Sequence, residues 1–121
     1  MLRGSATVKM DRWGRIRLPE KFLKPVIEKY GNEVFVTSID SKTVSVYPEQ
    51  VWLRMASIAS EKSKNRSIED FMRLANRNGV KTQIDEQGRI LVHKMLRERI
   101  NLKGDLLIEG KEDYLALSKK K

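Results

Sequence analysis

Hydrophobic and polar positions alternate along residues 6–10, which is the pattern of a half-buried β-strand. The alternation returns along residues 15–18, where two arginines alternate with two aliphatic residues. The tetrad 11–14 between them has the composition of a tight turn, because aspartate accepts hydrogen bonds from nearby backbone N–H groups and glycine tolerates positive φ. We therefore predict a β-hairpin. Its return strand directs Ile16 and Leu18 inward and Arg15 and Arg17 outward.

A helix and a second hairpin are predicted next. Apolar residues recur at helical spacing over residues 22–30, and Pro19 suits the first turn of a helix. Pro25 lies inside the pattern and would break or kink it, so two short helical turns are expected rather than one straight helix. Gly31 is expected to end this helical region. Residues 33–38 and 43–47 then read as two paired strands.

Two helices are predicted in the middle of the chain. Pro48 can open the first helix, and residues 60–66 are polar and indicate a loop. Ser67 can cap the second helix, with Asp70 three residues on, and Gly79 can end it. The first helix carries an apolar stripe, formed by Val51, Trp52, Met55, Ile58 and Ala59.

An internal repeat organises the chain. Residues 11–18 align with residues 85–92 at an offset of 74, and both copies read D-x-x-G-R-I. The second copy predicts strands near 80–84, 89–92, 105–109 and 113–118, with a short helix near 94–100. The predicted organisation is one domain over 1–121, with repeats at 1–47 and 79–121 and connecting helices at 48–78.

The repeat also predicts the fold class. One copy of about 45 residues is too small to hold a stable core alone. Two copies can pair strands across a pseudo-two-fold axis and close a small β-barrel, which removes unpaired strand edges. We therefore expect a mainly β fold with short helices (α+β), built as a small barrel from two fused repeats.

Charge is the informative part of the composition. The 121 residues include 25 Lys and Arg against 16 Asp and Glu, a net charge of +9. A domain this basic commonly meets a polyanion, because neutralising phosphates releases condensed counterions. The alternative is a charge that serves solubility, since the excess is spread as +4, +2 and +3 over 1–47, 48–78 and 79–121.

The sequence gives no positive support for catalysis. It contains no cysteine, which excludes disulfides and thiolate metal sites and is compatible with a reducing cytoplasm. The single histidine, His93, has no companion ligand and is expected at the surface or at a strand end. No apolar stretch approaches the roughly 18 residues of a membrane span, and the N-terminus lacks a signal-peptide core. We expect no enzyme activity, cofactor, bound metal, membrane contact or small-molecule substrate.

The D-x-x-G-R hairpins are the candidate binding elements. In each, the turn fixes the backbone and an arginine follows at the first outward position of the return strand. In the first copy, Lys9 is expected on the outer side of the paired strand. Guanidinium groups on a rigid ribbon can clamp phosphates or reach base edges in the major groove. The alternative is that Arg15 and Arg89 pair with Asp11 and Asp85 and brace their turns. Trp13 is unusual at a turn tip and either anchors a subunit contact or folds back on the hairpin.

With these motifs placed, the chain resembles the MraZ family of bacterial transcriptional regulators, within the AbrB/SpoVT superfamily. The resemblance covers essentially the whole chain. The residues that carry it are Leu2-Arg3-Gly4, the two D-x-x-G-R motifs with Pro19 and Phe22 after the first and Leu96-Arg97 after the second, and Val46-Tyr47-Pro48 before Trp52. In this sequence His93 stands where the family usually has proline, and Trp13 where it usually has a polar residue.

The resemblance implies a fold and a function. It implies a swapped-hairpin or cradle-loop β-barrel, ring-like homo-oligomers, a nucleoid-associated cytoplasmic location, and binding to direct DNA repeats upstream of the division and cell-wall genes. The motif arginines would contact double-stranded DNA. The predicted set is Arg15, Arg89, Arg3, Lys9 and Arg17 for DNA, and Asp11, Gly14, Asp85 and Gly88 for the turns. Two alternatives stay open, an AbrB-type antitoxin that binds DNA as a dimer and an RNA-binding or assembly module that does not bind DNA.

Overall fold

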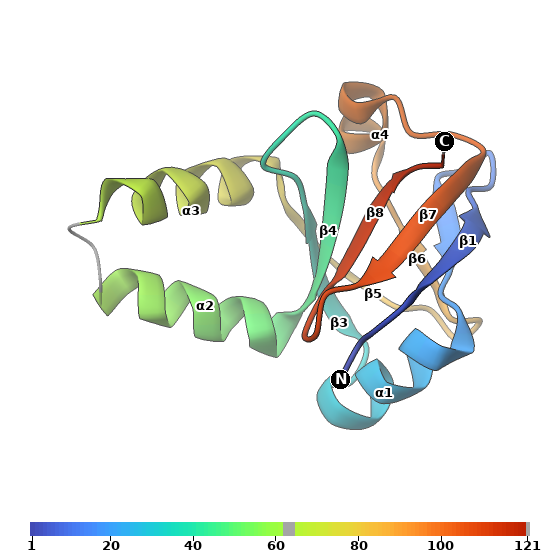
Figure 1. The fold of residues 1–121 in the computed structure, drawn as a ribbon, viewed down its shortest axis with the longest axis horizontal. Coiled ribbons are helices and arrows are strands. Elements are labelled where there is room, and N and C mark those ends of the chain that lie inside the picture. The colour runs from blue at the N-terminus through green and yellow to red at the C-terminus, as the bar shows by residue number, and fades with distance from the viewer. Residues whose placement is uncertain (62–64, 121) are drawn as a thin grey trace.

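The computed structural model describes residues 1–61 and 65–120. Eight strands and four helices follow one another along this part of the chain (Figure 1). In order they are β1 (Ser5–Lys9), β2 (Arg15–Arg17), α1 (Glu20–Tyr30), β3 (Glu33–Thr37), β4 (Thr43–Pro48), α2 (Glu49–Glu61), α3 (Arg66–Asn78), β5 (Val80–Gln83), β6 (Arg89–Leu91), α4 (Lys94–Ile100), β7 (Asp105–Gly110) and β8 (Leu115–Lys119).

The strands form a six-stranded antiparallel sheet in the order β1-β7-β8-β4-β3-β5 and a separate two-stranded ribbon of β2 and β6. The first strand of each half of the chain pairs with the third strand of the other half. The counterparts in the two halves are β1 and β5, β3 and β7, and β4 and β8. When each strand is replaced by its counterpart, the sheet has the same strand order read from its other edge. This is the strand exchange expected of two fused copies related by a two-fold axis, and the predicted mainly β fold with short helices is confirmed.

The predicted closure into a barrel is wrong. The six-stranded sheet is open, with β1 and β5 at its two edges. The strands β2 and β6 are three residues long and pair with each other. The predicted pairing of residues 6–10 with residues 15–18 is therefore wrong, because β1 pairs with β7 and only the turn between β1 and β2 is closed as in a hairpin. In that turn the N–H of Asp11 donates to the carbonyl of Arg15, and in the second copy the N–H of Asp85 donates to the carbonyl of Arg89. Such short strands form a separate ribbon and do not provide the continuous hydrogen bonding between β1 and β5 that would close a barrel.

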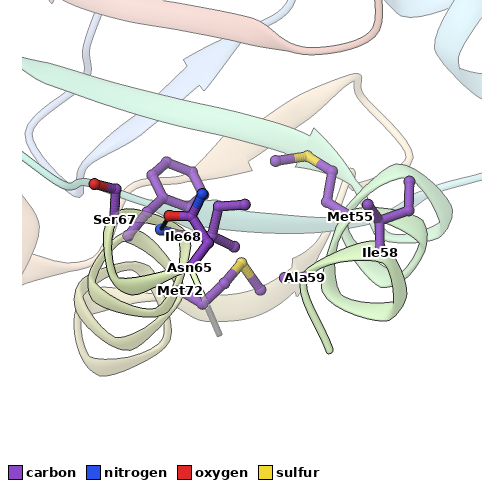
Figure 2. Close-up of a pocket in the computed structure, with 8 residues that line it drawn as sticks. Met55, Ile58, Ala59, Asn65, Ser67, Ile68 and Met72 are labelled. Atoms are coloured by element: carbon purple, nitrogen blue, oxygen red, sulfur yellow. Dashed lines mark hydrogen bonds between the residues drawn. The ribbon is translucent and has the colours of Figure 1, made fainter. Parts of the chain in front are cut away.

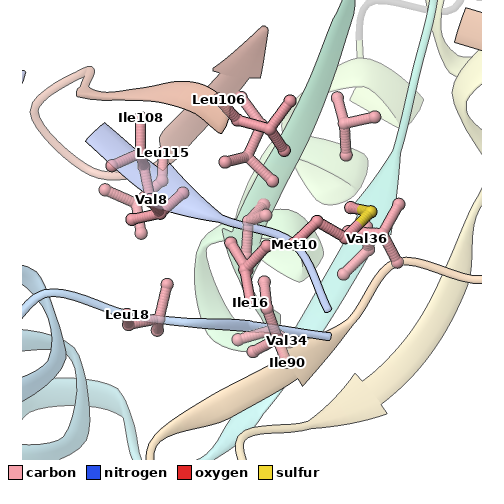
Figure 3. Packing of buried hydrophobic residues seen from close by; sticks show 14 of the residues in the cluster. Val8, Met10, Ile16, Leu18, Val34, Val36, Ile90, Leu106, Ile108 and Leu115 are labelled. Carbon is pink, nitrogen blue, oxygen red and sulfur yellow. The ribbon is translucent and has the colours of Figure 1, made fainter. Parts of the chain in front are cut away.

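Two apolar clusters fill the interior. The larger cluster joins the sheet, the ribbon, α1 and α4, and Figure 3 shows Ile16 and Ile90 of the ribbon among its side chains. These two isoleucines are 0% and 1% exposed, so the ribbon is anchored to the core through one face. The smaller cluster lies under α2 and α3, where the ring centroids of Phe35 and Trp52 are 4.5 Å apart.

The helix α1 is continuous, so the break predicted at Pro25 is wrong. The ring of Pro25 removes one backbone donor, but its fixed φ is close to the helical value. Phe22 and Val26 are buried against the core, and this burial stabilises the helix past the missing hydrogen bond. The helix ends at Gly31, whose N–H donates to the carbonyl of Ile27 at 3.0 Å.

The helices α2 and α3 lie side by side and extend from one side of the sheet, at the left of Figure 1. The predicted cap at Ser67 is wrong, because the Asn65 side chain accepts the hydrogen bond from the N–H of Ile68 at 3.2 Å. The predicted loop at 60–66 is shorter, since α2 continues to Glu61 and α3 begins at Arg66; residues 62–64 lie outside the described residues. No helix among the described residues is long and apolar enough to cross a membrane.

Candidate nucleic-acid interface

The ribbon of β2 and β6 brings the two D-x-x-G-R motifs together, although they are 74 residues apart in sequence. In the antiparallel register Arg17 lies opposite Arg89 and Arg15 lies opposite Leu91. Since successive side chains of a strand point to opposite faces, these four share the outer face, and Ile16 and Ile90 share the buried one. The structure therefore gathers three arginines on one outward surface of the molecule.

Each motif turn is built around its aspartate. The Oδ1 of Asp11 accepts hydrogen bonds from the N–H groups of Trp13 and Arg15, both at 2.9 Å. The N–H of Arg15 is the largest influence that lowers the pKa of Asp11, and the charges of Arg15 and Arg89 lower it further. An effect of Arg89 on Asp11 requires the two motifs to be close, as the ribbon register places them.

The second turn repeats this geometry. The Oδ1 of Asp85 accepts from the N–H groups of Gln87 and Arg89, both at 2.9 Å, and the Arg89 N–H is the main cause of the lowered pKa of Asp85. Gly88 has a φ of +76°, and the corresponding Gly14 has a φ of +87°. Both glycines occupy the left-handed region that side chains rarely adopt, which is why the motif has glycine there.

The arginines of the two motifs differ in their partners. The Nε of Arg89 donates to the Oδ2 of Asp85 at 3.1 Å, so the second arginine braces its own turn. Among the described residues, the Arg15 side chain forms neither a hydrogen bond nor an ion pair. The bracing interpretation thus describes the second motif and does not describe the first.

The other two predicted contact residues lie at opposite ends of β1. Lys9 is exposed at the end that leads into the first turn, and its register partner is Asp105 of β7. Arg3 precedes the other end, where its Nε lies 3.2 Å from Oε1 of Glu112 in the β7–β8 turn. The structure brings Arg15, Arg17 and Arg89 together and leaves Arg3 apart from them.

The first turn contains a further arginine, Arg12, and a second one, Arg97, lies beside it. The guanidinium carbon of Arg12 lies 4.4 Å from the ring centroid of Trp13, and that ring is 57% exposed. Trp13 therefore projects outward and does not fold back on the hairpin. Arg97 of α4 lies against Gly14, because a Cβ placed on this glycine would be 2.6 Å from the Arg97 Cζ. Arg97 is not in the predicted contact set. The repeat alignment nevertheless places it at the position of Leu23, and this replacement of an apolar residue by a charged one is the signal that could have identified it.

His93 precedes α4 and is partly buried. Burial is the main cause of its lowered pKa, and the charge of Arg97 lowers it further. Its buried Nε2 has no hydrogen-bond partner among the described residues. Within the same part of the chain no three His, Asp or Glu side chains are grouped so as to hold a metal ion.

Comparison with known proteins identifies the family. Residues 1–78 match the family model of the MraZ protein, which is described as antitoxin-like. This chain belongs to the MraZ family.

Members of the MraZ family with the name transcriptional regulator MraZ match nearly the whole chain. The protein of Acidobacterium capsulatum is 33% identical over 119 residues, which are 98% of this chain and 82% of that protein. The protein of Koribacter versatilis is 31% identical over 97% of this chain and 81% of its own length. The protein of Nitrosomonas eutropha is 28% identical over 97% of this chain and 80% of its own length.

This MraZ-family chain also carries an apolar groove of about 390 Å³ between α2 and α3 (Figure 2). Its walls include Met55 and Ile58 from the first helix and Ile68, Phe71 and Met72 from the second. Among the described residues, the lining contains no titratable side chain. The described part of the groove is therefore an apolar surface, and its lining residues come from α2, α3 and the residue before α3, not from the ribbon.

Proposed function

We propose that the chain is a transcriptional regulator that binds double-stranded DNA through the outer face of the β2–β6 ribbon. The observation that carries this proposal is the ribbon register, which gathers Arg15, Arg17 and Arg89 on one outward face. A two-stranded ribbon fits the major groove of B-DNA, and arginine is the residue most often used to read guanine there. The names of the MraZ-family relatives agree with this role.

The charge of the chain supports the same proposal. A net charge of +9 attracts the phosphate backbone regardless of sequence and raises the local concentration of the protein along DNA. The buried isoleucines hold the ribbon backbone in place, so the backbone that carries the arginines loses little freedom on binding. The proposal includes no chemical step and requires no cofactor, and it places the protein in the cytoplasm on the nucleoid.

A single ribbon offers few contacts, because each of its strands has three residues. We propose that a ring-like homo-oligomer presents several ribbons to direct DNA repeats upstream of the division and cell-wall genes. Linking modules multiplies weak single-site binding through effective concentration. Specificity would then depend on the spacing of the repeats as well as on their sequence.

The proposal is tested by fluorescence anisotropy. The full chain is titrated against DNA from immediately upstream of its own gene and against a scrambled duplex of equal composition, at four or more salt concentrations. Tighter binding to the upstream duplex and affinity that falls with salt support the proposal. Equal affinity for the scrambled duplex contradicts sequence specificity, and preference for a matched RNA indicates the RNA-binding alternative.

A second candidate function is an antitoxin that binds DNA as a dimer. The family model is described as antitoxin-like, and the apolar α2–α3 groove is a surface separate from the ribbon. Native mass spectrometry distinguishes the two candidates. A ring contains more than two chains, whereas a mass of two chains in the DNA-bound and free states favours the antitoxin.

A further inference from the structure

The two motif turns carry opposite charge. Residues 11–15 contain two arginines and one aspartate, a net charge of +1. Residues 85–89 contain one arginine with Asp85 and Glu86, a net charge of −1. Phosphate is attracted to the first turn, whereas the charge of Arg17, which lies opposite Arg89, only offsets the negative charge of the second.

The motif arginines repeat this difference in their geometry. Arg89 is already paired with Asp85 at 3.1 Å, and both side chains are about one-third exposed. To contact a phosphate, Arg89 would have to give up this pair or share its charge with Asp85. The charge of Arg15 acts on Asp11 without an ion pair or hydrogen bond among the described residues, so its guanidinium is available to an external anion.

The helix residues that pack against the two turns also differ in charge, and the charged one lies at the first turn. Leu23 of α1 lies against Gly88 of the second turn, because a Cβ on this glycine would be 2.7 Å from the leucine Cδ2. At the equivalent place Arg97 of α4 lies against Gly14 of the first turn. The Nε of Arg97 is buried and has no hydrogen-bond partner among the described residues. One repeat therefore adds a cation to the turn of the other.

We propose that the two hairpins contribute unequally to DNA binding: the first hairpin and Arg97 make the phosphate contacts, and the second hairpin braces the ribbon. This inference rests on the proposed function and assigns its binding energy to one end of the ribbon. Arg12, Arg15 and Arg97 neutralise phosphates around the first turn. Arg89 stays with Asp85 and holds the geometry of the second turn.

Trp13 has a separate part in this arrangement. Its exposed ring, covered on one side by Arg12, gives the first turn an apolar surface at its tip. An apolar contact with the sugar edge or a thymine methyl is not screened by salt, unlike a phosphate contact. Trp13 therefore contributes affinity that is the same at every salt concentration.

The test compares matched variants at equivalent positions in the two repeats. Arg15→Gln and Arg89→Gln each remove one charge and keep a side chain of similar length. Affinity for a duplex of DNA from upstream of the gene is measured by anisotropy from about 50 to 300 mM salt. We expect R15Q to lower affinity about tenfold and to reduce the salt slope by about one, as the loss of one phosphate contact does. R89Q is expected to lower affinity by only about twofold and to reduce the slope by less than about half a unit, because Arg89 shares its charge with Asp85.

Two more variants use the repeat itself as a control. Leucine is already accommodated at position 23, so Arg97→Leu keeps the packing and removes the charge; it is expected to reduce the slope by about one. Glu86→Arg gives the second turn the residue that Arg12 provides in the first, and it is expected to increase the slope. Trp13→Ala is expected to lower affinity by the same factor at every salt concentration and so to leave the salt slope unchanged. Melting temperatures of all variants verify that they fold.

The outcomes separate this inference from the proposed function. Equal losses of slope in folded R15Q and R89Q overturn the inequality of the hairpins and leave the ribbon as the DNA-binding surface. An unchanged slope in R97L overturns the role of Arg97. If the wild-type chain binds DNA and neither R15Q nor R89Q changes the slope, DNA binds elsewhere and the proposed ribbon surface is wrong. Absence of any DNA binding by the wild-type chain overturns the proposed function itself.

Discussion

The two D-x-x-G-R hairpins have the same backbone and different surfaces. Each turn has an aspartate that accepts two N–H bonds and a glycine with positive φ, and each strand places an isoleucine in the core. Outside this frame the first turn carries Arg12 and Trp13, and the second carries Glu86 and Gln87. The difference shows that folding constrains the turn geometry and the buried positions, and leaves the exposed positions free to diverge.

The residues that pack against the two turn glycines also differ between the copies. Leu23 and Arg97 occupy equivalent places on α1 and α4, and each covers one turn glycine. A leucine fills this place by apolar contact alone, whereas Arg97 fills it with its guanidinium and so brings a charge next to the first turn. The repeat thus tolerates a change from packing to charge at a position that touches a motif of the other copy.

Substitutions under the ribbon should have the largest effect and should affect both hairpins alike. Ile16→Ala and Ile90→Ala each remove a side chain that is at most 1% exposed, and each is expected to destabilise the fold by about 3 kcal/mol. Urea unfolding followed by circular dichroism measures both. A large loss in one variant and none in the other would show that the core does not share the symmetry of the strand order.

Substitutions at the turn glycines should have a smaller effect. Gly14→Ala and Gly88→Ala each force a side chain into positive φ, which costs about 1–2 kcal/mol. In the first turn the new methyl also displaces the Arg97 guanidinium, and in the second it displaces a leucine methyl. Urea unfolding is expected to show similar losses for the two variants, and only G14A is expected to reduce the salt slope of DNA binding.

The pH dependence of stability should reveal the histidine behind the first turn. The pKa of His93 is lowered from its ordinary value of 6.5, first by burial and then by Arg97, so the folded state favours the neutral ring. The contribution of the neutral ring to the free energy of unfolding is fully present above pH 6.5 and is lost as the pH falls below this value. His93→Pro, which copies Pro19 of the other repeat, is expected to remove this dependence. Since His93 is the only histidine, an NMR titration measures its pKa directly.

The turn aspartates should give the smallest effect, confined to acid. The pKa values of Asp11 and Asp85 are lowered from 3.8, mainly by the N–H groups of Arg15 and Arg89. Each aspartate contributes stability that is present above pH 3.8 and lost as pH falls through its lowered pKa. Melting temperatures of Asp11→Asn and Asp85→Asn between pH 5 and 2 measure the two contributions. The comparison is sharpened if D85N loses more, because it alone also gives up the Arg89 side-chain bond.

Local sequence patterns determined most of the elements. Alternation and turn composition identified the strands and turns of both copies, because side chains of a strand alternate between faces and only certain residues fit tight turns. They did not identify the partners of these strands, since β1 pairs with β7 and not with β2. The helix break at Pro25 and the cap at Ser67 were predicted wrongly. In both cases a local preference was outweighed, at Pro25 by burial of the neighbouring turns and at Ser67 by an asparagine two residues earlier.

The amino-acid sequence by itself determined that the chain consists of two copies of one β unit, that each copy presents a D-x-x-G-R turn, and that the whole is basic. Only the tertiary structure decided that β2 pairs with β6, that the sheet stays open, and that Arg97 reaches the turn of the other repeat. The reason is physical. Periodicity and turn chemistry act between neighbours in the chain, whereas pairing between copies depends on which surfaces meet when both bury their apolar faces together.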